Sequence, residues 1–336
     1  MPRAFISGCA GLALSAEERD FFRDTDPWGL ILFKRNVESR EQLIALTDAF
    51  RTCVGRDDAP VLIDQEGGRV QRMGPPHWRA YPAAARFEAS FPSGRAEEAA
   101  RLTARLLAHD LRACGITVDC APVLDVADPE THAVIGTRAF SDDPARVAAL
   151  ARAFAEGLLA GGVAPVVKHM PGHGRARADS HFELPKVSAS RTELARDFAP
   201  FKALADLPMA MTAHVVYTAL DPDRPATISP TVVRDVMRGE IGFDGLIMTD
   251  DLSMKALGGP FEARARSAIA AGVDMVLHCN GLLEEARAVA SASPELAGEA
   301  LRRADAALAA IRAPQPFDLA EAERAFASAM DALSAA

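Results

Sequence analysis

The stretch LLAGGVAPVVKHMPGHG (158–174) contains the repeating unit from which the fold can be predicted. A segment of helical period ends at Gly161-Gly162, and a nearly continuous apolar run follows at once. The run closes on Lys168 and His169, before a loop rich in Gly and Pro. Apolar runs without alternation are typical of strands buried on both faces of a parallel sheet. The stretch therefore predicts a helix, a buried strand and a loop that carries polar side chains.

The same unit recurs along the whole chain. Segments of helical period separate eight apolar runs, which lie at 4–8, 28–33, 59–64, 116–124, 164–170, 209–215, 245–250 and 274–278. Capping pairs such as Ser15 with Glu18 mark helix starts, and so do the pairs Asp143-Pro144 and Ser293-Pro294. Strand and helix alternating eight times predict an α/β fold of the (β/α)₈ TIM-barrel type.

A doubly wound open sheet is the alternative arrangement of the same alternation. It would be expected to carry a GxGxxG phosphate loop after an early strand, and the sequence contains none. Beyond residue 282 the chain is rich in Ala, Glu and Arg, without a linker before it, which predicts two or three terminal helices. We expect a single TIM-barrel domain over residues 1–336, with helices of about 283–336 packed on the barrel.

Composition limits the partners and the compartment. The net charge is −9, whereas nucleic-acid binding needs clustered Lys and Arg. No apolar run approaches the roughly 18 residues that span a bilayer, and the N-terminal stretch reads as a strand and helix rather than a signal peptide. The five cysteines are scattered without CxxC spacing, which indicates reduced thiols. We expect a cytoplasmic monomer that binds neither nucleic acid nor membrane.

Polar side chains gather where the apolar runs end. In a barrel, catalytic groups lie at the carboxyl ends of the strands. The residues found at or just after these ends are Asp64, Asp125, Lys168, His169, His214, Asp250, Asp251 and His278. Because an unpaired buried charge is costly, this repeated placement indicates a functional site. For Asp125 and His278 a purely structural role is an equal alternative.

A metal site is not expected among these residues. His169 and His173 have the spacing of a helical zinc pair, but the proline and glycines around them exclude a regular helix. The first run, where metal-dependent amidohydrolase barrels carry an HxH pair, ends instead in Ile6-Ser7-Gly8. We therefore expect neither a metal nor a cofactor.

The loop KHMPGHG (168–174) is typical of a backbone that comes close to a ligand. Lys168 and His169 can donate hydrogen bonds to the hydroxyl groups of a sugar, and Asp64 can accept from two hydroxyls at once. Arg72 stands eight residues after Asp64, beyond Gly67-Gly68, and we expect it to return to the same pocket.

Three segments together resemble the bacterial β-N-acetylglucosaminidases of glycoside hydrolase family 3: IDQEGGRVQR (63–72), KHMPGHGRARADSH (168–181) and MTDDLSM (248–254). Supporting matches are GLILFKRN, APVLDV, MTAHVVY and AGVDMVLHCN, so the likeness runs from about residue 28 to 280. The resemblance implies a TIM barrel. For the single-domain bacterial branch, it also implies cleavage of terminal N-acetylglucosamine from anhydro-muramoyl peptides during cell-wall recycling.

The resemblance also implies a role for each matching residue. Asp250, the first acid of TDD, corresponds to the nucleophile, and His181 of DSH to the general acid/base, with Asp179 as its partner. A histidine suits this task because its ordinary pKa lies near neutrality. The residues that correspond to those binding the terminal sugar in the family are Asp64, Arg72, Arg138, Lys168 and His169. Asp251 is expected to be structural, since a second carboxylate beside the nucleophile would raise one pKa.

Two positions depart from the family pattern, and three other functions stay open. Met170 stands where Phe is usual, and Arg175 stands where the loop usually carries Asp. A β-glucosidase-like hydrolase of family 3 is the nearest alternative activity. A Schiff-base aldolase using Lys168 is an alternative from another enzyme class. A sugar-binding protein without catalysis is the third.

Overall fold

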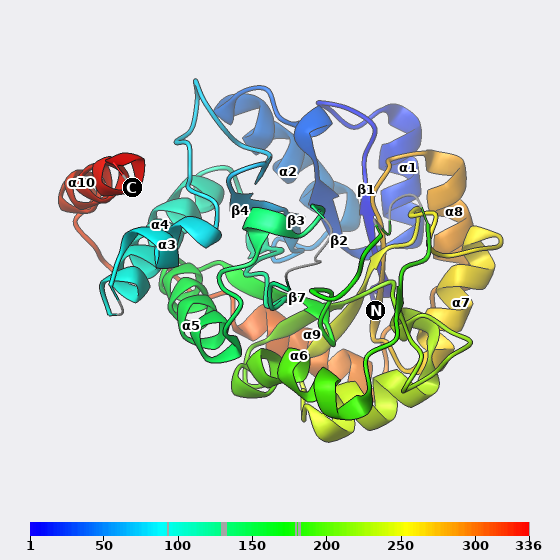
Figure 1. The fold of residues 1–336 in the computed structure, drawn as a ribbon. Coiled ribbons are helices and arrows are strands. Elements are labelled where there is room, and N and C mark those ends of the chain that lie inside the picture. Colours follow the sequence, from blue (N-terminus) through cyan, green and yellow to red (C-terminus); the bar gives the residue numbers. More distant parts are fainter. Residues whose placement is uncertain (93, 129–132, 179, 181–182, 336) are drawn as a thin grey trace.

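A closed barrel of eight parallel strands forms the centre of the computed structural model, which describes all residues except 93, 129–132, 179, 181–182 and 336 (Figure 1). The strands follow the order β1-β12-β11-β9-β7-β6-β3-β2 around the barrel. Their bounds are β1 Arg3–Gly8, β2 Pro27–Leu32, β3 Val61–Ile63, β6 Val118–Asp119, β7 Ala164–Met170, β9 Met209–Thr212, β11 Leu246–Asp251 and β12 Met275–His278. Each predicted apolar run overlaps one of these strands, so the predicted (β/α)₈ barrel is confirmed.

The barrel is closed by the pairing of its first and last strands, in which Phe5 lies beside Val276. Successive side chains of each strand point to opposite faces. On β7, Val166 belongs to the apolar cluster inside the barrel, while Val167 packs in the layer between the barrel and the helices. Both faces of the strands are therefore buried, which explains why the runs are continuous rather than alternating.

The helices surround the barrel (Figure 1). Their bounds are α1 Ala16–Thr25, α2 Arg40–Val54, α3 Ala85–Ser90, α4 Arg95–Arg112, α5 Pro144–Ala160, α6 Arg191–Ala203, a helical segment Val232–Glu240, α7 Phe261–Ala271, α8 Leu283–Ala292, α9 Gly298–Ala309 and α10 Leu319–Ala335. The predicted capping box of Ser15 and Glu18 is present, with both reciprocal hydrogen bonds. Asp143 caps α5, which begins at Pro144 and ends before Gly161.

One predicted helix start is wrong. No helix begins at Pro294, because the chain there pairs with the first strand instead. The carbonyl of Pro294 accepts the N–H of Ala4, and Leu296 donates its N–H to the carbonyl of Pro2. Backbone hydrogen bonds with residues 2–4, which are near in space but distant in sequence, outweigh the local capping signal.

The terminal helices meet different parts of the barrel. Ala304 and Ala307 of α9 pack against the apolar cluster inside the barrel, at the end where the strands begin. Helix α10 lies beside α3 and α4 (Figure 1). Its Phe326 ring lies 5.7 Å from the ring of Tyr81, centroid to centroid. In the described part of the chain, no helix is long and apolar enough to cross a membrane.

Candidate active site

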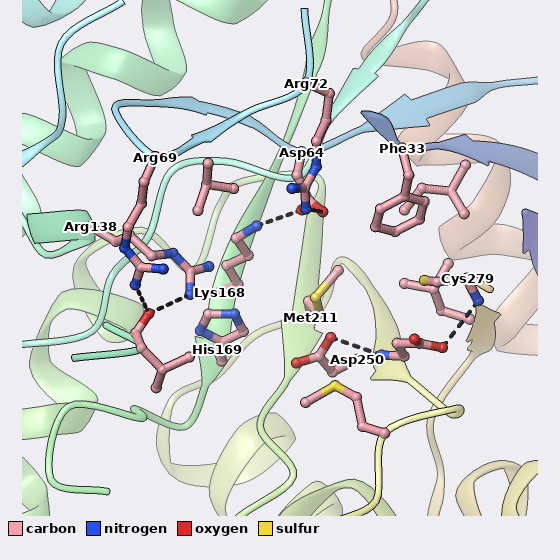
Figure 2. Close-up of a pocket in the computed structure, with 16 residues that line it drawn as sticks. Phe33, Asp64, Arg69, Arg72, Arg138, Lys168, His169, Met211, Asp250 and Cys279 are labelled. Carbon is pink, nitrogen blue, oxygen red and sulfur yellow. Dashed lines mark hydrogen bonds and ion pairs between the residues drawn. The ribbon is translucent and has the colours of Figure 1, made fainter. Parts of the chain in front are cut away.

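A pocket of about 280 Å³ opens where the barrel strands end (Figure 2). Every predicted site residue that the structure describes lines it: Asp64, Arg72, Arg138, Lys168, His169 and Asp250. Apolar side chains, including Phe33, Met211 and Leu277, complete the wall. The remaining two predicted residues, Asp179 and His181, lie outside the described residues. The pocket thus combines charged hydrogen-bonding groups with apolar surface, as a sugar ring requires.

A tight hairpin brings Arg72 back to Asp64. Strand β4 (Gln65–Gly67) pairs antiparallel with β5 (Val70–Gln71). Gly67 has a φ of +92°, and a Cβ at this position would lie 2.3 Å from the carbonyl oxygen of Pro82, so the reversal needs a glycine. After the turn, Nη2 of Arg72 donates to Oδ2 of Asp64 over 2.9 Å. The expected return of Arg72 to the pocket is confirmed.

Three cations and two carboxylates form one connected group, here called the charged cluster: Arg72, Asp64, Lys168, Glu66 and Arg138. Nζ of Lys168 lies 2.8 Å from Oδ1 of Asp64 and 2.7 Å from Oε1 of Glu66. Arg138 donates two hydrogen bonds of 2.7 Å to Glu66. Sequence reasoning missed Glu66, because it lies inside the motif IDQEGGRVQR and not at a strand end.

The cluster fixes the charge of its members. Burial alone would raise the pKa of Asp64, but the cations of Lys168 and Arg72 outweigh it and hold that pKa well below its usual range. Burial alone would lower the pKa of Lys168, but Asp64 and Glu66 outweigh it and raise the pKa above its ordinary value. Because imine formation needs a neutral amine, the paired Lys168 ammonium lacks the activation that the aldolase alternative requires.

Asp125 orients His169. Oδ2 of Asp125 lies 2.7 Å from Nδ1 of His169, and its Oδ1 accepts the backbone N–H groups of His169 and His173. Burial would raise the pKa of Asp125, but the adjacent His169 outweighs it, and the pKa falls to about 2. Since Nδ1 is engaged, Nε2 is the ring nitrogen of His169 that, within the described part of the chain, is left for a ligand. Of the two roles left open for Asp125, the geometry supports orientation of a pocket residue.

His278 has a structural environment instead. Its side chain is fully buried, its Nε2 lies 3.2 Å from Oε2 of Glu285, and its ring meets the Phe261 ring edge to face. It does not line the pocket.

His214 contacts the end of β11, because its Nε2 lies 3.0 Å from the carbonyl oxygen of Asp251.

The neighbouring acids Asp250 and Asp251 differ in what their carboxylates do. Oδ1 of Asp251 accepts the backbone N–H groups of Ser253 and Cys279 at 2.9 and 3.0 Å, and Oδ2 accepts the Ser253 hydroxyl. Oδ1 of Asp250 accepts the N–H of Asp251 at 2.8 Å, and its carboxylate is exposed to the pocket (Figure 2). This arrangement fits the expected structural role of Asp251.

The loop after β7 is held at several points. The ring of His173 lies edge-on to that of His169, with 5.6 Å between centroids. Burial lowers the pKa of His173 to about 4, so its ring is neutral at pH 7. Arg175, one of the two departures from the family pattern, donates from Nε to Asp197 of α6 over 2.7 Å. The other departure, Met170, is fully buried.

Within the residues that the structure describes, no three His, Cys, Asp or Glu side chains are grouped so as to hold a metal ion. The five cysteines are free thiols, four of them buried.

Comparisons with known proteins place this geometry in a family. The model of the glycosyl hydrolase family 3 N-terminal domain matches residues 6–308. A β-hexosaminidase of Pseudomonas aeruginosa is 43% identical over 307 residues, which cover 90% of this chain and 87% of that protein. The crystal structure of NagZ from Neisseria gonorrhoeae in complex with N-trifluoroacetyl-D-glucosamine is 34% identical, with a TM-score of 0.87 over 99% of both chains. NagZ of the same organism in complex with a zinc ion is 32% identical, with a TM-score of 0.83 over 99% of this chain and 97% of that one. The chain therefore belongs to glycosyl hydrolase family 3 and is a β-hexosaminidase.

Proposed function

We propose that this enzyme removes terminal N-acetylglucosamine from peptidoglycan-derived anhydro-muramoyl peptides, through a covalent glycosyl-enzyme intermediate on Asp250. One observation carries the proposal: the Asp250 carboxylate and the charged cluster line the same pocket, on different walls (Figure 2). A retaining glycosidase needs a carboxylate nucleophile and side chains that bind the hydroxyl groups of the sugar.

The charged cluster and His169 would bind the terminal sugar. Lys168 and Arg138 supply N–H donors, and Asp64 supplies carboxylate acceptors, so both the oxygens and the hydrogens of hydroxyl groups find partners. The pocket volume of about 280 Å³ is at the low end for ligand pockets. A volume of this size favours one terminal sugar over an internal segment of a long chain.

The reaction would run in two displacements. In the first, the Asp250 carboxylate attacks C1 of the sugar, the bond from C1 to the glycosidic oxygen breaks, and that oxygen takes a proton from His181. In the second, water attacks C1 while His181 takes a proton from the water, and the bond to Asp250 breaks. Asp179 would orient the His181 ring and stabilise its charged form. Two inversions at C1 give net retention.

The roles of His181 and Asp179 rest on the DSH motif. Ser180, the middle residue of that motif, is buried. Its carbonyl oxygen accepts the N–H of Ala256, which lies in the segment that follows Asp250 in the chain, over 3.2 Å. This contact supports a shared site for the motif and Asp250.

The sugar and the aglycone have different support. The related Neisseria protein was solved with an N-acylated glucosamine, which supports an N-acylated glucosamine in this pocket too. The anhydro-muramoyl peptide as the leaving part is supported by the resemblance to the single-domain bacterial branch.

Mass spectrometry tests the proposal. After treatment with a slow fluorinated N-acetylglucosaminide, the sugar adduct should be found on the peptide that contains Asp250, at that residue. A label on Asp251 or Asp64, or an inverted anomer of the product by NMR, would refute the double displacement.

A second assay tests the aglycone. Release of N-acetylglucosamine from a purified anhydro-muramoyl peptide disaccharide should exceed its release from chitobiose. An equal or lower rate would refute the proposed aglycone.

A further inference from the structure

Glu66 lies directly behind the pocket. It belongs to β4 of the hairpin, and its side chain is only 7% exposed. It is not among the residues that line the active-site pocket. On its other side it borders a small, mostly apolar space with Phe87, Phe140 and Phe154 among its neighbours. A buried carboxylate in such surroundings needs strong partners on its polar side.

Those partners are two residues that do line the pocket. Arg138 binds Glu66 with a fork, in which Nε donates to Oε2 and Nη2 to Oε1, both over 2.7 Å. Lys168 places Nζ 2.7 Å from the same Oε1. Two-bonded guanidinium–carboxylate pairs combine strength with a fixed orientation. Burial alone would raise the pKa of Glu66, but Arg138 and Lys168 outweigh it and bring the pKa to about 2.

Lys168 and Arg138 keep N–H donors that Glu66 and the other described protein groups do not use. The Lys168 ammonium has three N–H bonds, of which Asp64 accepts one, and Glu66 forms an ion pair with the same ammonium. The Arg138 guanidinium has five, of which Glu66 takes two and the carbonyl oxygen of Val134 takes one over 3.0 Å. Within the residues that the structure describes, at least one N–H of Lys168 and two of Arg138 then remain for a ligand. The two hydrogen bonds to Glu66 fix the plane of the Arg138 guanidinium, in which its remaining N–H bonds lie.

We propose that Glu66 is a positioning residue, which aims the free N–H donors of Lys168 and Arg138 at hydroxyl groups of the terminal sugar without touching the sugar itself. The inference rests on the proposed function insofar as Lys168 and Arg138 bind that sugar. It assigns to the Glu of the motif IDQEGGRVQR a role separate from that of Asp64, which lines the pocket directly.

Removing the charge of Glu66 has a definite consequence. The charged cluster holds three cations and two carboxylates, so neutralising Glu66 leaves three cations with Asp64 alone. A glutamine has the same shape, but one of its two terminal atoms becomes an N–H donor that faces the N–H donors of Arg138 or Lys168. The fork and the Lys168 contact then cannot all form at once. Lys168 and Arg138 repel each other and lose their fixed directions.

The test is Glu66→Gln in the full-length enzyme, assayed on aryl N-acetylglucosaminide and on its 3-, 4- and 6-deoxy analogues. We expect kcat/KM on the parent substrate to fall roughly 10- to 100-fold, the range found when the partners that orient metal ligands are replaced. The second expectation is specific to positioning. In the wild type, removing the hydroxyl that Lys168 or Arg138 binds should lower kcat/KM. In Glu66→Gln, kcat/KM on that deoxy analogue should lie within about threefold of kcat/KM on the parent substrate, because the contact is already impaired.

Two variants complete the test. Glu66→Asp keeps the charge but cannot reach both cations at once, so its loss should be smaller and fall on the same hydroxyl; it also serves if Glu66→Gln does not fold. Glu156→Gln is the matched control, because it removes a Glu–Arg pair with Arg101 that is exposed and remote from the pocket, and it should retain wild-type kinetics.

The kinetics distinguish a positioning role of Glu66 from a purely structural one. If Glu66→Gln and Glu66→Asp lose the same factor on the parent and on every deoxy analogue, Glu66 only stabilises the fold and the inference is overturned. Unchanged kcat/KM in both variants overturns it too. If instead the wild type does not discriminate against any deoxy analogue, the sugar-binding part of the proposed function fails, whatever Glu66 does.

Discussion

The backbone N–H of Asp251 donates a 2.8 Å hydrogen bond to Oδ1 of Asp250, while the Asp251 carboxylate is itself held by Ser253 and Cys279. Two adjacent carboxylates in one pocket would repel each other, and the pKa of one would rise. Here the second acid is compensated by three donors from its own surroundings. Its backbone also helps to hold the first acid in place, so in the proposed mechanism Asp250 reacts and Asp251 supports it.

This division predicts different results for two equivalent substitutions. Asp250→Asn should lower kcat on aryl N-acetylglucosaminides by roughly 10⁴-fold or more, the scale for loss of a covalent nucleophile. Asp251→Asn should cost stability of about 1–3 kcal/mol, because an amide group would face donors that now meet a carboxylate. Steady-state kinetics and urea unfolding of both variants check this. Greater loss of kcat in Asp251→Asn than in Asp250→Asn would reverse the assignment.

The barrel could be predicted from the sequence because its strands are buried on both faces. APVVKHM (164–170) forms β7 over that same range, and each of the other apolar runs overlaps a strand. Lys168 and Asp250 could be found for a related reason, since in a parallel barrel every strand end lies on one face. The return of Arg72 followed from the two glycines, as Gly67 takes a conformation that favours glycine.

The parts that could not be predicted depend on distant partners. Glu66 lies within a short hairpin strand, and its role arises only because Arg138 and Lys168 come to it from 72 and about 100 residues further along the chain. The same holds for Ser293-Pro294, whose local signal for a helix start gives way to pairing with residues 2–4. Spacing along the sequence carries no information about such contacts.

Metal dependence gives a second prediction. The histidine pair that resembles a zinc motif is engaged differently, because Nδ1 of His169 is taken by Asp125 and the two rings meet edge to face. In the proposed mechanism, protons are transferred by His181. Hydrolysis of aryl N-acetylglucosaminides should therefore proceed at the same rate after exhaustive treatment with EDTA, as measured by aglycone release. Activity that disappears in EDTA and returns with added zinc would contradict this.

The buried His173 predicts a loss of stability in mild acid. Its pKa falls from about 6.5 in the unfolded chain to about 4 in the fold, so below pH 6.5 the unfolded state binds more protons. Stability should therefore decrease as the pH falls from 6.5 toward 4, with a contribution from His173 of about 2 kcal/mol between pH 7 and 5. Urea unfolding at both pH values measures the total, and His173→Asn should reduce the difference. His77→Asn, at an exposed histidine, is the control, and an equal reduction in both variants would contradict the prediction.

The leaving group decides how much His181 matters. A nitrophenolate departs readily without a proton, whereas the alkoxide of a sugar is far more basic and does not. If His181 is the general acid, His181→Ala should lose more kcat/KM on a sugar aglycone than on an activated aryl aglycone, by a further factor of about 10²–10⁴. A series of aryl N-acetylglucosaminides of rising leaving-group pKa measures this as a steeper slope. Asp179→Asn should steepen the slope in the same direction, because it removes the charge that supports the imidazolium.

Ser180→Ala, which keeps the backbone contact with Ala256, is the control and should keep the wild-type slope. If His181 only helped to bind the substrate, rates would fall by the same factor for every leaving group, and a flat slope in His181→Ala would end the general-acid assignment.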